Sequence, residues 1–181
     1  MFEWFRRQRT DENGVTIFIG LLQVYCFNLS KEEPEPAGLQ HLRFYADLPP
    51  EGKGVFKLAV ACLKVVVITR ILANKHDAAG RAMAKEFRQT VVDAYTEDMG
   101  GRAGDYVANL LQAYDEAFAR PSEYCYNPND AAWFLRPIDE SLLLLRDDIL
   151  LCAFIENHIH DASKILKNAI SLKGRDAGIS G

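Results

Sequence analysis

The stretch "VFKLAVACLKVVVITRIL" (residues 55–72) decides the fold. Apolar residues recur in it at steps of three and four, and the other positions are mostly apolar too, with Lys57, Lys64 and Arg70 as the exceptions. This pattern is typical of a helix that is buried on nearly all sides. The letters "VVVIT" alone are compatible with a strand, but strands rarely extend this far without a breaker. We therefore predict a buried helix.

Proline positions and apolar stripes predict further helices after this one. All seven prolines lie outside residues 51–120, and proline interrupts the interior of a helix. Apolar residues at helical spacing predict one helix over about 74–100, ended by a glycine pair, and another over 105–120. The letters "AAWFLR" (131–136) predict a short helix, and the proline after them suits the first turn of a long last helix over about 138–172.

The whole chain, residues 1–181, is predicted to form one all-α domain. Residues 14–29 are expected to form a helix with some strand character. An acidic, proline-bearing stretch predicts a linker over 30–53, residues 1–12 form a basic and aromatic N-terminal segment, and "KGRDAGISG" (173–181) is expected to be a flexible tail. The expected architecture is a single-domain helical bundle of five or six helices with a long C-terminal helix.

Composition narrows the classes of function. The net charge of −4 gives no overall attraction for nucleic acid, so we expect no nucleic-acid partner. None of the four cysteines forms a Cys-x-x-Cys pair, which argues against a zinc or thiol-redox site and indicates a reducing, cytoplasmic location. The apolar run over 15–29 is shorter than the ~20 residues that a membrane-spanning helix needs.

The segment "AFIENHIHDASKIL" (153–166) contains the best candidates for a metal site. His158 and His160 are two residues apart, so on a helix they project about 200° from each other and do not share one ion. Glu156 and His160 lie one turn apart, as do Asp93 and Glu97, and these four are the candidate ligands.

A polar helix face explains the same residues without a metal. The chain has no Glu-x-x-His pair of the kind that di-iron bundles use, and no His-Glu-x-x-His motif. We therefore expect no metal and no other cofactor, with His158 packed inward and Glu156 and His160 on a polar face. The chain also has no Gly-x-Ser-x-Gly motif and no phosphate-binding glycine loop, so we expect no enzyme.

Binding of another protein is the function that remains. Aromatic residues and arginines alternate in residues 1–9, as they do in segments that contact a membrane surface, but aromatic residues that fold back onto the core explain this pattern equally well. The second and third predicted helices offer an acidic binding face, with carboxylates at Asp93, Glu97, Asp98, Asp105, Asp115 and Glu116. The candidate partner-binding residues are Phe2, Trp4, Arg6 and Arg7 near the N-terminus, and Asp93, Glu97 and Asp98.

Residues from about 43 to 118 resemble the ubiquinol–cytochrome c chaperone family. The segments that carry the resemblance are "RFYADLPPEGKGVFKLAVACLKVVVITRIL" (43–72), "AGRAMAKEFRQTVVDAYTEDM" (79–99) and "QAYDEAF" (112–118). They have the family's aromatic residue and short loop before a buried helix, and an alanine-rich helix that ends in Asp98 and Met99. The family's basic, glycine-containing insertion is replaced here by "GGRAGD" (100–105), and the C-terminal third has no counterpart in it.

The resemblance implies a non-catalytic chaperone that holds newly made subunits during the assembly of a membrane respiratory complex. Such an assembly factor would be cytoplasmic or peripheral at the membrane, with membrane contact through residues 1–9. The alternative is a soluble adaptor, immunity or regulatory protein that sequesters one protein partner. A helical metal-binding enzyme is the third hypothesis, and it requires a bound metal.

Overall fold

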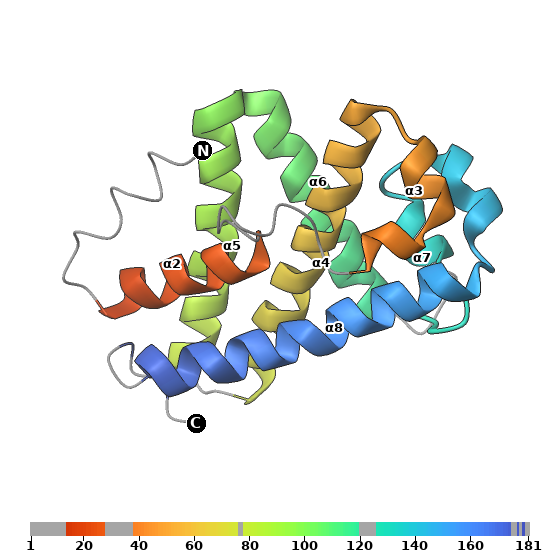
Figure 1. Ribbon diagram of the computed structural model, residues 1–181. Coiled ribbons are helices and arrows are strands. Elements are labelled where there is room, and N and C mark those ends of the chain that lie inside the picture. The colour runs from red at the N-terminus through yellow and green to blue at the C-terminus, as the bar shows by residue number, and fades with distance from the viewer. Residues whose placement is uncertain are drawn as a thin grey trace.

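Helices and turns make up the computed structural model, which describes residues 14–27, 38–75, 78–119, 126–174, 177 and 179 (Figure 1). Apart from one β-bridge between Asn127 and Asp130, this described part of the chain contains no strand. The long helices are α2 (Gly14–Cys26), α4 (Pro50–Lys75), α5 (Ala78–Met99), α6 (Gly101–Ala119) and α8 (Ile149–Ala169). The shorter elements are η1 (Leu39–His41), α3 (Arg43–Asp47), α7 (Ala132–Leu135), η2 (Glu140–Leu145) and η3 (Ile170–Gly174). The predicted all-α helical bundle is confirmed.

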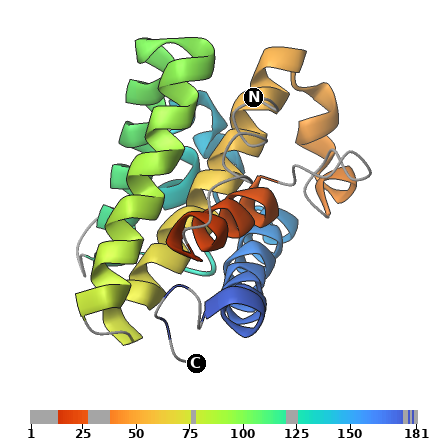
Figure 2. The ribbon, with the colours of Figure 1, turned by 90° about the vertical axis from the view of Figure 1, so that its left-hand side faces the viewer.

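Helix α4 lies at the centre of the bundle. Every residue from Ala59 to Thr69 is buried, as the apolar pattern on all sides of this helix predicts. Helices α5 and α6 pack on one side of α4, and α8 crosses it on another side, with α2 beside α8 (Figures 1 and 2). The hydroxyl of Thr69 donates to the carbonyl oxygen of Val66 at 3.0 Å, which satisfies a polar group inside the core.

Aromatic rings connect α4 to the smaller elements. Phe56 is fully buried, and its ring lies 5.5 Å from that of Phe44, 5.7 Å from that of Phe134 and 6.1 Å from that of Phe154. These rings belong to α3, α7 and α8. Phe56 is therefore the point where four elements of the bundle meet.

The hairpin between α5 and α6 is tighter than predicted. Gly100 adopts φ 90°, a left-handed conformation that ends α5 at little steric cost because glycine has no Cβ. Helix α6 then begins at Gly101, four residues before the predicted start at Asp105. Gly104 of α6 packs directly against the side chain of Thr96 of α5, so the two helices approach closely at their junction.

The last helix begins at Ile149, so the predicted start near residue 138 is wrong. Asp139 accepts a hydrogen bond from the Ser141 amide at 2.8 Å and starts η2 instead. Asp148 accepts from the amides of Leu150 and Leu151 at 2.8 and 3.0 Å and caps the N-terminus of α8. The two capping aspartates divide the expected single helix into η2 and α8. Helix α8 still has 21 residues, and the predicted long C-terminal helix is confirmed.

Two segments expected to lack structure are partly ordered against the core. Within the predicted linker over 30–53, residues 38–53 form η1, α3 and the start of α4, because Leu39, Leu42 and Tyr45 bury apolar side chains. Within the predicted tail over 173–181, Ile179 is buried, and its amide donates to the carbonyl oxygen of Gly174 at 2.8 Å. Residues 1–13 and 30–37 lie outside the described residues.

Candidate protein-binding surface

The four candidate metal ligands form two pairs, which lie on different helices in separate parts of the bundle. Glu156 and His160 belong to α8, whereas Asp93 and Glu97 are exposed on the C-terminal half of α5. In Figure 1, α8 runs along the bottom of the bundle and the C-terminal end of α5 lies at the top. Across the described residues, no three His, Cys, Asp or Glu side chains are grouped so as to hold a metal ion. The structure does not bring these candidates together into one site.

The histidine pair of α8 separates into an inward and an outward side chain. His158 is 2% exposed and packs edge-on against Phe154, with ring centroids 4.4 Å apart, so the prediction that it faces inward is confirmed. His160 is exposed and Glu156 is half-buried, one turn apart. Burial raises the pKa of the Glu156 carboxyl, whose Oε1 atom is enclosed without a hydrogen-bond partner. Glu156 thus behaves as a packed side chain with a desolvated oxygen.

The buried cysteines are unsuited to nucleophilic chemistry. Burial raises the pKa of the Cys26 thiol to about 12 and also raises that of Cys62, so both are protonated at neutral pH. Burial lowers the pKa of the nearby Lys64, an effect that Cys26 and Asp161 oppose. Cys26 and Cys62 are 3% and 0% exposed and pack as part of the core.

The carboxylates of the predicted acidic face differ in their exposure to solvent. Asp115 binds Arg70 at 2.9 Å and Arg88 at 3.2 Å, so it ties α6 to α4 and α5. Asp93, Glu97 and Asp98 are exposed, and Met99 beside them is 65% exposed. The end of α5 therefore remains a candidate binding face. The N-terminal candidates Phe2, Trp4, Arg6 and Arg7 lie outside the described residues.

The two most exposed large apolar side chains of the described residues, Leu144 and Ile149, lie where η2 meets α8, a feature that the sequence did not reveal. Leu144 is 95% exposed, Ile149 82% and Leu150 56%. The amide of Asp148 donates to the carbonyl oxygen of Leu145 at 3.0 Å and closes a turn, so Leu144 and Ile149 flank the same turn. We call Leu144, Ile149 and Leu150 the apolar turn. Its sequence signal is the pair of capping aspartates, which interrupts an otherwise helical pattern of leucines.

Hydrogen bonds and packing hold the apolar turn in a fixed conformation. Capping by Asp139 and Asp148 sets the start of η2 and of α8. The carbonyl oxygen of Arg146 accepts from the Ala131 amide at 2.7 Å and from the Cys152 thiol at 3.6 Å, which anchors the turn to α7 and α8. On the inner side, Leu142, Leu143 and Leu145 pack against the core. The apolar side chains are therefore presented on an ordered frame.

The segment that carries the apolar turn has a net negative charge. Residues 139–148 contain the carboxylates Asp139, Glu140, Asp147 and Asp148 and one basic residue, Arg146, which gives four negative charges against one positive charge. Arg146 donates to Asp147 at 3.3 Å, and both side chains are more than half exposed. The hydrogen bond from the Ser141 amide lowers the pKa of the Asp139 carboxyl, so this carboxylate is ionised at neutral pH. The segment that carries the apolar turn therefore combines exposed aliphatic side chains with a net negative charge.

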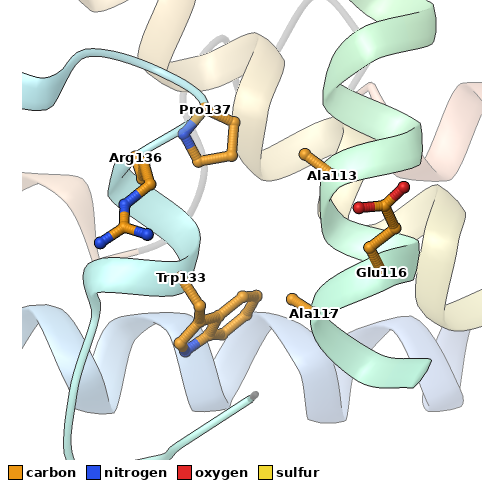
Figure 3. Close-up of a pocket in the computed structure, with 6 residues that line it drawn as sticks. All are labelled: Ala113, Glu116, Ala117, Trp133, Arg136 and Pro137. Carbon is orange, nitrogen blue, oxygen red and sulfur yellow. The ribbon is translucent and has the colours of Figure 1, made fainter. Parts of the chain in front are cut away.

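A small pocket lies between α6 and the segment that contains α7 and the two residues after it. It has a volume of about 260 Å³ and is lined by Ala113, Glu116, Ala117, Trp133, Arg136 and Pro137 (Figure 3). Glu116 and Arg136 stand on opposite sides of it, and the indole of Trp133 lies at its base. The Trp133 Nε1 atom donates to the carbonyl oxygen of Asn127 at 3.3 Å, which holds the ring in place. Since most ligand sites exceed about 300 Å³, this pocket suits a single side chain better than a cofactor.

Comparison with protein-family models, curated proteins and solved structures finds no match for this chain. Among the described helices, none is both long and apolar enough to cross a lipid bilayer.

Proposed function

We propose that this chain is a non-catalytic helical protein that binds another protein. The observation that carries the proposal is the apolar turn, where three large aliphatic side chains are exposed on an ordered frame. Exposed apolar groups rimmed by polar residues are typical of protein-interaction surfaces, because covering them releases water and stabilises the complex. An ordered frame lowers the entropy lost on binding.

The specific function that we propose is that of a chaperone or assembly factor for a membrane respiratory complex, at a cytoplasmic location. Its support is the resemblance of residues 43–118 to the ubiquinol–cytochrome c chaperone family. The apolar turn lies outside this stretch, in the C-terminal third, so it adds an independent reason to propose protein binding. Contact with the membrane through residues 1–9 belongs to the same proposal.

The alternative is a soluble adaptor, immunity or regulatory protein that binds its partner through the end of α5. Its support is the exposure of Asp93, Glu97 and Asp98 beside the exposed Met99. An acidic face with one apolar side chain suits a basic protein surface and favours rapid association.

An affinity pull-down from the native cells with three forms of the tagged chain tests these proposals. The forms are the wild type, the double variant Leu144→Ser, Ile149→Ser, and the triple variant Asp93→Lys, Glu97→Lys, Asp98→Lys. Mass spectrometry that finds respiratory-complex subunits with the wild type, and their loss with the double variant, supports the assembly factor. Loss of a soluble partner with the triple variant alone supports the regulator. Absence of any stoichiometric partner in all three forms contradicts both proposals.

A further inference from the structure

We propose that the apolar turn binds a cationic amphipathic helix of the partner protein. Apolar residues of that helix cover Leu144, Ile149 and Leu150, and its Lys and Arg residues face the carboxylates of residues 139–148. The inference rests on the proposed protein-binding function and specifies the chemistry of the partner.

Charge complementarity selects this partner. The carboxylates within residues 139–148 outnumber the single arginine by four to one. Asp139 and Glu140 precede Leu144 in sequence, and Asp147 and Asp148 lie between Leu144 and Ile149. Exposed carboxylates attract cations over about 8 Å at physiological salt, so a basic segment is favoured and an acidic one is disfavoured. The three exposed aliphatic side chains come from two consecutive elements, and an amphipathic helix presents a matching row of apolar residues.

The same charges disfavour two other occupants. A membrane surface that contains anionic lipid would be repelled by Asp139, Glu140 and Asp147. A second copy of the chain, packed symmetrically through this surface, would bring two sets of the same carboxylates together. A partner protein with basic residues beside an apolar row avoids both penalties.

Three synthetic 18-residue peptides test the inference on the full chain. The first has a leucine face and a Lys/Arg face when helical, the second has the same leucine face with Glu in place of Lys and Arg, and the third is a shuffled form of the first without an apolar face. Calorimetry at low and high salt measures their binding to the wild type and to three variants. The variants are Leu144→Ser with Ile149→Ser, Glu140→Gln with Asp147→Asn, and the control Leu172→Ser.

The control and the charge variant are chosen to leave the fold intact. Leu172 is 60% exposed in η3, which follows the C-terminal end of α8, so its substitution removes one exposed apolar side chain away from the apolar turn. Glu140 and Asp147 do not cap a helix, unlike Asp139 and Asp148. Circular dichroism is expected to show the same helix content in all four proteins.

The first peptide is expected to bind the wild type and the control variant with equal affinity. Its affinity for each of the other two variants is expected to be at least roughly tenfold lower. The inference also predicts that high salt weakens this binding and that the second and third peptides bind at least roughly tenfold more weakly than the first. Equal binding of the first two peptides, or no loss with either variant, overturns it. So does binding to vesicles containing phosphatidylserine, or formation of a dimer, if the double variant Leu144→Ser, Ile149→Ser abolishes it while residues 1–9 are unchanged. If a partner is captured in the pull-down but the first peptide does not bind, the inference fails while protein binding itself stands.

Discussion

Replacement of Phe56 by alanine is expected to destabilise the whole bundle. Phe56 is fully buried on α4, and its ring contacts rings from α3, α7 and α8. Removing a buried phenylalanine side chain costs about 3–5 kcal/mol, which includes the lost transfer free energy and the cavity left behind. Because the neighbouring rings belong to different elements, the site has little freedom to collapse, and we expect a loss of about 4 kcal/mol.

Urea unfolding followed by circular dichroism measures this loss. For a chain of this length, about 4 kcal/mol corresponds to a fall in Tm of roughly 8–16 °C, and the midpoint in urea falls while the slope stays unchanged. The control is Leu144→Ala, which removes a side chain that is 95% exposed and is expected to change stability by less than about 0.5 kcal/mol. A loss below about 1 kcal/mol for Phe56→Ala would refute the view that this ring joins four elements.

Three further substitutions test the helix junction and two buried charges. Gly104→Ala places a Cβ against Thr96 and is expected to cost about 1–3 kcal/mol in urea unfolding, whereas Gly20→Ala, which meets no atom within 4 Å, is expected to be neutral or stabilising. Burial raises the pKa of Glu156 in the folded chain above its usual 4.5. Between 4.5 and that raised pKa the folded chain binds more protons than the unfolded chain, so the free energy of unfolding falls as pH rises through this range. Glu156→Gln is therefore expected to raise Tm at pH 7 and to have no effect well below pH 4.5, and an equal effect at both pH values would contradict this. Burial lowers the pKa of Lys64 below its usual 10.5, so the unfolded chain holds the extra proton and stability rises with pH up to that value. Lys64→Met is expected to raise Tm at pH 7 with a gain that shrinks as pH approaches 10.5, and a gain independent of pH would show that packing alone is responsible.

Apolar periodicity predicted the helices whose own residues determine which of their faces are buried. Residues 55–72 are apolar on nearly every side, so their central position in the bundle follows from the hydrophobic effect alone. The glycine pair at 100–101 marked the end of α5, and Gly100 supplies the left-handed turn there. The early start of α6 was missed because Gly101 and Gly104 are poor helix formers, and the close packing against Thr96 compensates for this.

The start of α8 and the apolar turn depend on a choice between two local structures. The letters "SLLLLRDDILL" (141–151) are compatible with one continuous helix, and only the hydrogen bonds that Asp139 and Asp148 accept show that the chain forms η2 and a turn first. Which leucine faces outward depends on the three-residue repeat of η2 and on its docking against α7, neither of which is visible in a row of four leucines. The burial of Ile179 could not be predicted either, because a single isoleucine in a polar tail forms no repeating apolar pattern.

Hydrogen–deuterium exchange of the full chain, alone and with the partner captured in the pull-down, tests the central claim most directly. Amides at the start of α8, such as those of Leu150 and Leu151, donate to the side chain of the half-buried cap Asp148 and are expected to exchange readily in the free chain. Binding at the apolar turn is expected to slow exchange over residues 140–151 and to leave residues 93–99 unchanged. Protection over 93–99 with none over 140–151 would contradict this expectation and assign binding to the acidic end of α5.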